Sequence, residues 1–240
     1  MRTRLFLVMV IIAGAVTIAA TLFLPALPPI RSEVTQTPAA ALPSQDPSQQ
    51  LNPEAAAAVG LLEQLDLSEP RNQDSYERDA FGQRWADIDR NGCDQRNDIL
   101  ARDLTGVTTK PGTRDCVVLT GTLDDPYTGT IIPFERGQGT SELVQIDHIV
   151  PLAWAWRQGA DAWTTDERER FANDPLNLQA TDGSTNASKS DRGPSEWMPP
   201  DNSYDCEYSA RFVEILATYD LTINTPDESA LAAKLTSCSS

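Results

Sequence analysis

The N-terminal segment places the strongest constraint on this chain, because it decides the compartment in which the rest must fold. Residues 1–24 begin with Arg2 and Arg4 and continue, from Leu5 to Leu24, as an uncharged run of 20 residues. About 20 apolar residues are enough to cross a bilayer as a helix, and flanking arginines stay on the cytoplasmic side. We therefore expect residues 1–24 to be a signal peptide or an N-terminal transmembrane anchor. The rest of the chain is then exported, either secreted or held at the cell membrane by this one helix.

Residues 25–53 follow with a composition that cannot build a hydrophobic core. They contain seven prolines among Ser, Gln, Thr and Ala, which favours an extended spacer. The full length of 240 residues allows one good-sized domain in addition to such a leader. We therefore expect one folded domain at residues 54–240.

Export also decides how the four cysteines are interpreted. In an oxidising compartment four cysteines most often form two disulfides. Their spacings, with 22, 89 and 31 intervening residues, contain no CxxC pair, which argues against a structural zinc site. Proximity in the sequence favours the pairs Cys93–Cys116 and Cys206–Cys238, and the other two pairings stay open.

The hydrophobic patterning predicts an α+β fold. Short strands are outnumbered by helices, and no alternating βαβ series is present, which argues against a doubly wound sheet. Expected helices lie at 54–67, 76–88, 94–104, 152–173, 206–219 and 228–235. One expected strand begins at residue 116, and three more lie at 130–134, 143–150 and 176–180. A loop with a short helix is expected at 186–197.

Charge and histidine content exclude several function classes. The chain has 19 Lys and Arg against 35 Asp and Glu, a formal net charge of −16. A protein that grips nucleic acid through a broad basic face carries the opposite sign. The single histidine, His148, also rules out catalysis by two histidines and any metal site with several histidine ligands.

The sequence around His148 is the most informative part of the chain. A lone histidine is usually a surface residue or a satisfied core residue. Here Asp147 precedes it at the end of an expected strand, and Pro151 ends that strand soon afterwards. Asn177-Leu178 and then Asn186-Ala187-Ser188-Lys189-Ser190-Asp191 follow within the same part of the chain.

These pieces resemble a known enzyme family. D-H-I-V-P at 147–151, N-L at 177–178 and N-x-S-K-x-D at 186–191 are similar to the three signature pieces of the HNH, or His-Me finger, endonucleases. Further segments, among them CDQRNDIL, DPYTG, FANDPLNL and EWMPP, resemble an exported bacterial branch that is related to the nuclease domain of GmrSD-type restriction enzymes. The resemblance covers roughly residues 70–240.

The resemblance implies a fold and a set of roles. The fold is a ββα-metal core embedded in additional helices, with strands at 143–150 and 176–180, a helix after Asn186 and residues 152–173 as an insertion. His148 would be the general base, while Asp147 and Asn186 would hold one divalent cation, Mg²⁺ or else Mn²⁺. Asn177 would orient the loop and the imidazole, with a simple turn cap as the alternative.

Three basic residues are candidates for contacts with substrate phosphates. Lys189 and Arg192 follow Asn186, and Arg96 lies in the CDQRN piece. Surface solubility is the alternative for the first two, and a structural ion pair is the alternative for Arg96.

The implied function is a metal-dependent endonuclease acting on DNA, with RNA as a further candidate substrate, outside the cytoplasm and with little sequence specificity. No obligate protein partner is implied, and the membrane is a partner only if the N-terminal helix is retained. Two alternatives stay open: a non-catalytic, membrane-tethered envelope or binding module that keeps the fold, and a nuclease toxin effector.

Overall fold

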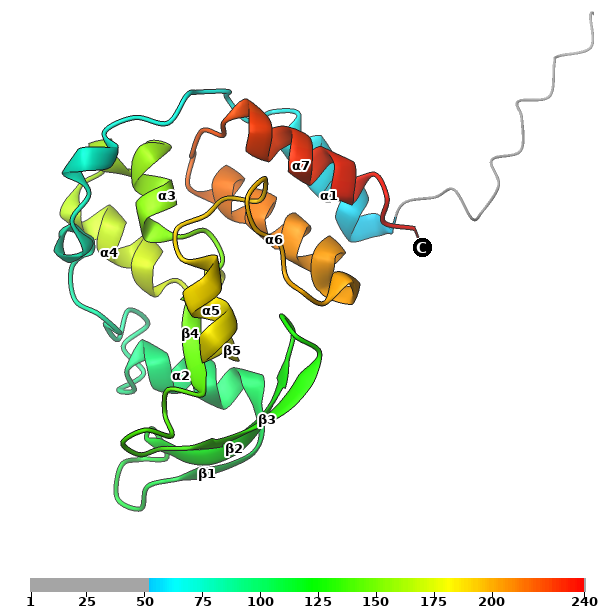
Figure 1. Cartoon of the computed structure of the whole chain (residues 1–240). Coiled ribbons are helices and arrows are strands. Elements are labelled where there is room, and N and C mark those ends of the chain that lie inside the picture. Colours follow the sequence, from blue (N-terminus) through cyan, green and yellow to red (C-terminus); the bar gives the residue numbers. More distant parts are fainter. Residues whose placement is uncertain (1–51, 240) are drawn as a thin grey trace, which may run out of the picture. The chain divides into compact units, whose positions relative to one another are not determined.

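The computed structural model describes residues 52–239 (Figure 1). The expected segment 1–24 and nearly all of the expected spacer lie outside this range. The helices are α1 (Pro53–Leu62), α2 (Gln95–Asp103), α3 (Leu152–Arg157), α4 (Thr165–Asn173), α5 (Gly183–Lys189), α6 (Asp205–Thr218) and α7 (Thr225–Leu235). The strands are β1 (Leu104–Thr109), β2 (Val118–Asp125), β3 (Thr130–Glu135), β4 (Val144–His148) and β5 (Leu178–Asp182). Between residues 52 and 239, no helix has both the length and the apolar character needed to span a membrane.

The strands form two small antiparallel sheets, so the α+β class is confirmed. One sheet has the order β1-β2-β3 and the other pairs β4 with β5. The turn between β2 and β3 starts at Asp125, whose partner across the hairpin is Thr130. Gly129 in that turn has a φ of +66°, a conformation that glycine adopts without steric cost.

The β4–β5 pair and α5 form the unit that positions the site. Val144 pairs with Asp182 and His148 pairs with Leu178, so the two strands run antiparallel. α5 follows β5 directly, because the side chain of Asp182 accepts a hydrogen bond from the backbone N–H of Thr185 and caps the helix. The start of α5 packs closely on the chain before β4: a Cβ built on Gly183 would lie 2.0 Å from the carbonyl oxygen of Glu142.

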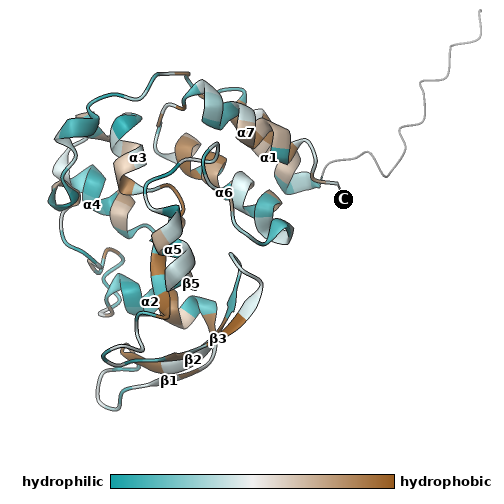
Figure 2. Ribbon diagram, in the orientation of Figure 1, coloured by the Kyte–Doolittle hydropathy of each residue, from teal (hydrophilic) through white to brown (hydrophobic). Residues whose placement is uncertain are grey.

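The two faces of the β4–β5 pair differ in chemistry because side chains alternate along a strand. One face is apolar and packs with Ile99 and Leu100 of α2; its residues are Val144, Ile146, Leu178 and Ala180. The other face is polar, and carries Gln145, Asp147, Gln179 and Thr181. In Figure 2 hydrophobic and hydrophilic residues alternate along β4, whereas α4 is largely hydrophilic.

Most of the remaining helices pack around a separate core. α6 lies against α1 and α7 (Figure 1), and contributes Phe212 to this core. Trp154 of α3 is only 2% exposed and packs edge-on against Phe212. Its role is therefore packing within this core.

Both expected disulfides are confirmed. Cys93–Cys116 joins the loop before α2 to the loop before β2, and Cys206–Cys238 joins α6 to the segment after α7. Each bridge closes a loop of the unfolded chain, which stabilises the fold by about 2–4 kcal/mol.

Several expected elements were wrong in type or in extent. The expected helix at 76–88 is only a 3₁₀ turn at Arg78–Phe81, because Gly82 and Trp85 both adopt positive φ and break helical geometry. The first helix ends at Leu62, and Leu67 forms a β-bridge with Ile223 instead.

Two further boundaries differ near the strands. β1 was not expected, because its sequence LTGVTT has a glycine and weak alternation. The expected helix after Asn186 begins earlier, at Gly183, so that Asn186 lies inside α5.

Candidate active site

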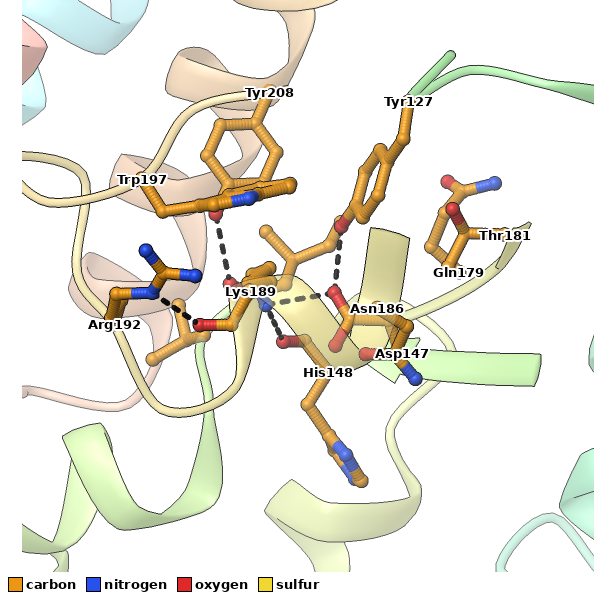
Figure 3. A network of polar contacts seen from close by, with 12 residues as sticks. Tyr127, Asp147, His148, Gln179, Thr181, Asn186, Lys189, Arg192, Trp197 and Tyr208 are labelled. Carbon is orange, nitrogen blue, oxygen red and sulfur yellow. Dashed lines mark hydrogen bonds and ion pairs between the residues drawn. The ribbon is translucent and has the colours of Figure 1, made fainter. Parts of the chain in front are cut away.

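Three of the expected site residues meet at one pocket. Asp147 and His148 are the last two residues of β4, and Asn186 lies in the middle of α5. All three line a pocket of about 450 Å³. The alternation along β4 sends the two neighbouring side chains in opposite directions, and Figure 3 shows the imidazole pointing away from the carboxylate of Asp147.

The imidazole of His148 is held in one orientation. Its Nε2 lies 2.8 Å from the carbonyl oxygen of Ala172 at the end of α4. A carbonyl only accepts hydrogen bonds, so Nε2 carries the proton and Nδ1 keeps a free lone pair. The ring of Trp85 stacks on the imidazole, with an angle of 10° between the planes.

The electrostatic surroundings keep this imidazole neutral. Burial lowers the pKa of His148 to about 4, although the hydrogen bond to Ala172 and the charge of Asp147 oppose that shift. At neutral pH the ring is therefore unprotonated at Nδ1. A neutral, oriented imidazole with one free nitrogen can accept a proton from a bound water.

Asp147 is buried, with 5% of its surface exposed. Among the described residues, only one of its two carboxylate oxygens accepts hydrogen bonds. Its Oδ2 accepts hydrogen bonds from the hydroxyl of Tyr127 and the ammonium of Lys189, each at 2.7 Å (Figure 3). Within residues 52–239, Oδ1 accepts no hydrogen bond, and it is not among the sealed polar atoms without a partner. Oδ1 is therefore open to solvent and available to a ligand.

Asn186 offers a second open oxygen. Its Nδ2 donates to Oε1 of Gln145 on β4 at 3.0 Å, and this contact fixes which way the amide points. The amide oxygen is thereby left free. A carboxylate oxygen and an amide oxygen are hard ligands, which suit Mg²⁺ or Mn²⁺ ions that retain several waters. The residues present therefore fit one divalent cation.

Asn177 is buried and holds the loop that follows β4. Its Oδ1 accepts from the backbone N–H of Val150 at 2.8 Å, and its Nδ2 donates to the carbonyl of Val150. Its own carbonyl accepts from the N–H of Ile149. Both polar atoms of the Asn177 side chain are therefore hydrogen-bonded to the loop after β4, as an orienting role requires. A residue that only capped its own turn would bond to residues close to it in the sequence.

The three basic candidates do not line the pocket. Lys189 is fully buried, and its ammonium donates to Asp147 and, at 2.6 Å, to the carbonyl of His148. Burial lowers the pKa of Lys189, and the charge of Asp147 opposes that shift. The alternative of a surface lysine that only aids solubility is therefore wrong, because Lys189 is buried and donates to Asp147 and His148. A contact between Lys189 and substrate phosphate stays a prediction.

The other two basic candidates lie elsewhere. Arg192 donates from Nε to the carbonyl of Lys189 and lines a different pocket, beside Trp154. Arg96 donates to the carbonyls of Val144 and Ser141, at the end of β4 opposite to His148. Among residues 52–239 Arg96 forms no ion pair. Its partners are main-chain carbonyls and not the acidic side chain that a structural ion pair requires.

The structure adds one basic residue that sequence reasoning missed. Arg78, in the 3₁₀ turn before Gly82, lines the same pocket as His148. Its Nη1 is buried and has no hydrogen-bond partner within the described part of the chain. Its charge contributes to the low pKa of His148, which places it near the imidazole. No motif marks Arg78, and only the folded chain brings it to this pocket.

Comparisons with known proteins identify the family to which the chain belongs. A family model described as the C-terminal domain of GmrSD restriction endonucleases matches residues 94–234. An uncharacterized secreted protein of Arthroderma benhamiae (strain ATCC MYA-4681 / CBS 112371) is 36% identical over 200 residues, covering 82% of this chain and 93% of that protein. No solved structure matches. A bacterial origin stays a prediction. The matched segment contains the whole β4–β5–α5 unit, and the chain belongs to the family of GmrSD restriction endonuclease C-terminal domains.

Proposed function

We propose that this chain is a metal-dependent endonuclease that hydrolyses phosphodiester bonds of DNA, with His148 as the general base. The observation that carries the proposal is the hydrogen bond from Nε2 of His148 to the carbonyl of Ala172, which leaves Nδ1 free in the pocket that Asp147 and Asn186 also line. Membership in a family of restriction endonuclease domains supports a nuclease activity.

The order of the elements supports the HNH subtype. β4 pairs antiparallel with β5, and α5 follows directly, which is the strand–strand–helix order of a ββα-metal unit. α3 and α4 form the expected insertion between the two strands. The base stands at the end of the first strand, and the amide ligand stands on the helix.

The chemistry follows from the groups that are in place. Nδ1 of His148 takes a proton from a water molecule, whose oxygen then forms a bond to phosphorus while the bond to the leaving ester oxygen breaks. Asp147 and Asn186 would hold the divalent cation, which supplies charge stabilisation at the leaving oxygen. Asn177 keeps the loop after His148 in place and touches neither reactant. The leaving oxygen finally takes a proton from solvent.

Export and broad specificity complete the proposal. The relative from Arthroderma benhamiae is described as secreted, which supports export of this chain. The net charge of −16 opposes long-range attraction to nucleic acid. We therefore infer modest affinity that depends on local contacts and on metal, with little sequence reading.

A plasmid-nicking assay with the full chain tests the proposal. We expect nicking in Mg²⁺ or Mn²⁺, none after EDTA treatment, and strongly reduced nicking by Asn186→Ala at low Mg²⁺ that excess metal partly restores. An RNA substrate tested in parallel defines the substrate range. Folded protein that cleaves neither substrate with any metal contradicts the proposal and favours the non-catalytic module. Nicking that persists unchanged in EDTA shows that cleavage does not require the metal.

Arg78 provides a separate prediction about substrate binding. Arg78→Gln removes a guanidinium whose buried Nη1 has no hydrogen-bond partner within residues 52–239 and which lines the pocket of His148. We expect the KM for DNA to rise about 10- to 100-fold, since a hydrogen bond to a charged group contributes roughly 1.5–3 kcal/mol. Arg84→Gln, an exposed position outside the pocket, is the matched control and should leave the KM within about twofold. Steady-state kinetics at several salt concentrations measure both variants. Equal effects of the two substitutions would reduce the role of Arg78 to general charge.

A further inference from the structure

The loop that leads into α2 carries oxygen-bearing side chains at regular spacing. Residues 87–98 read DIDRNGCDQRND. Counted from the first residue of this loop, oxygen donors occupy positions 1, 3, 5 and 12, and glycine occupies position 6. This is the spacing of the twelve-residue calcium loop, with aspartate in place of the usual glutamate at the last position. The residues are Asp87, Asp89, Asn91, Gly92 and Asp98.

In the folded loop three of these side chains accept hydrogen bonds from the backbone of the loop itself. The two carboxylate oxygens of Asp87 accept the backbone N–H groups of Asn91 and Gly92, at 3.0 and 2.9 Å. Oδ1 of Asn91 accepts from the N–H of Cys93 at 2.7 Å. Gly92 has a φ of +93°, which the tight turn requires and which other residues rarely adopt. The side chains at positions 1, 3 and 5 therefore hold the backbone of the loop in a tight turn.

An independent observation points to a missing counter-charge at this loop. Asp98 enters from the first turn of α2, and its Oδ2 is buried without any hydrogen-bond partner among the described residues. The Asp98 carboxyl is hydrogen-bonded by the side chain of Asn91 and lies near the carboxylates of Asp89, Asp87 and Asp94. None of these four aspartates takes part in an ion pair within residues 52–239. A buried, unpaired carboxylate oxygen is costly, and a bound cation would offset that cost.

We infer that residues 87–98 bind one Ca²⁺, with the side chains of Asp87, Asp89, Asn91 and Asp98 and the main-chain carbonyl of Cys93 as ligands. In the part of the chain that the structure describes, no three His, Cys, Asp or Glu side chains are placed to hold a metal ion by themselves. The proposed site therefore also needs the amide of Asn91 and the main-chain carbonyl of Cys93. Calcium fits such a loop, because it accepts irregular sets of six to eight oxygens that include amides, carbonyls and waters. Mg²⁺ demands a compact octahedron and fits it less well.

The loop is connected to the candidate active site. The N–H of Gln95 approaches the carbonyl of Trp85, and the Trp85 ring stacks on the imidazole of His148. On its other side the loop is tied to the β2 segment through Cys93–Cys116. A Ca²⁺ ion in this loop orders the segment that holds Trp85, and through Trp85 it stabilises the position of the His148 imidazole. This ion is distinct from the cation proposed at Asp147 and Asn186.

Calorimetric titration of the full chain with CaCl₂, after EDTA treatment and its removal, tests this site without any activity readout. The Asn186→Ala protein serves as the background, because it lacks an amide ligand of the proposed catalytic cation. We expect one Ca²⁺ per chain with a Kd of roughly 10⁻⁴–10⁻³ M, the range of extracellular calcium modules. Adding Asp98→Asn or, at an exposed position, Asp89→Asn should weaken binding about tenfold or more.

Asp94→Asn is the matched control, because it removes the same charge from the same loop. Asp94 caps α2 by accepting from the N–H of Asn97, and asparagine serves as well in that position. We expect its Ca²⁺ affinity to stay close to that of the background protein. The inference is overturned if the background protein binds no Ca²⁺, or if Asp94→Asn weakens binding as much as Asp89→Asn. Circular dichroism establishes that each variant is folded.

Discussion

Replacing Lys189 by methionine should lower the free energy of unfolding by about 3–5 kcal/mol, the usual cost of removing one partner from a buried ion pair. The ammonium of Lys189 is the cation paired with Asp147, and it also satisfies the carbonyl of His148. Methionine keeps most of the volume but leaves the carboxylate with the hydroxyl of Tyr127 alone. Urea denaturation at neutral pH in EDTA, where no divalent cation can substitute for the lysine, measures the loss.

Two further variants separate the buried charge from general effects. Arg71→Met breaks the pair with Asp161, in which the arginine side chain is 53% exposed, and should cost no more than about 1 kcal/mol. Asp147→Asn combined with Lys189→Met removes both charges and should recover part of the stability, because no unpaired ion remains. A loss for Lys189→Met no larger than that for Arg71→Met contradicts the structural role of the ammonium.

The second large effect concerns His148, whose replacement should reduce kcat for plasmid cleavage by about 10²–10⁴, the typical contribution of a general base. His148→Gln is the informative variant, because its amide nitrogen reaches about as far as Nε2 of histidine and can still donate to the carbonyl of Ala172 while offering no basic nitrogen. We expect His148→Ala and His148→Gln to lose kcat equally, with KM nearly unchanged. Added imidazole should partly restore the alanine variant.

The outcome for His148→Gln decides between two roles. If the glutamine variant keeps kcat within about tenfold of the natural chain, His148 serves to hold the end of α4 and another group supplies the base. Thermal unfolding followed by circular dichroism shows whether either variant is folded under the assay conditions. Nicking by the natural protein in the same buffer provides the reference rate.

The features that could be predicted from the sequence are those that depend on local sequence patterns. The strand ending at His148, the second strand before the helix that contains Asn186, and both disulfides follow from alternation, the turn residues and the cysteine spacing. The grouping of Asp147, His148 and Asn186 at one pocket was expected from motif order.

What could not be predicted depends on contacts between distant segments. Lys189 stands in a polar run that indicates an exposed helix end, and only the positions of Asp147 and Tyr127 show that its ammonium is buried. The segment around Arg78 has helical composition, but Phe81 is drawn into the core and the chain turns away at Gly82. β1 exists because β2 offers a pairing edge, which its own sequence does not signal.

The acceptor that holds the His148 ring is a main-chain oxygen, and this has a consequence for how the protein can diverge. The tautomer of the base therefore depends on the main chain at position 172 and not on the chemistry of a side chain, while burial of Ala172 requires a small residue there. What must be preserved is the backbone path at the end of α4, which Asn173 secures by accepting from the N–H of Ala86 and donating to the carbonyl of Gln83. Descendants of this chain can therefore vary the outer surface of the insertion widely, provided that its last turn keeps its place.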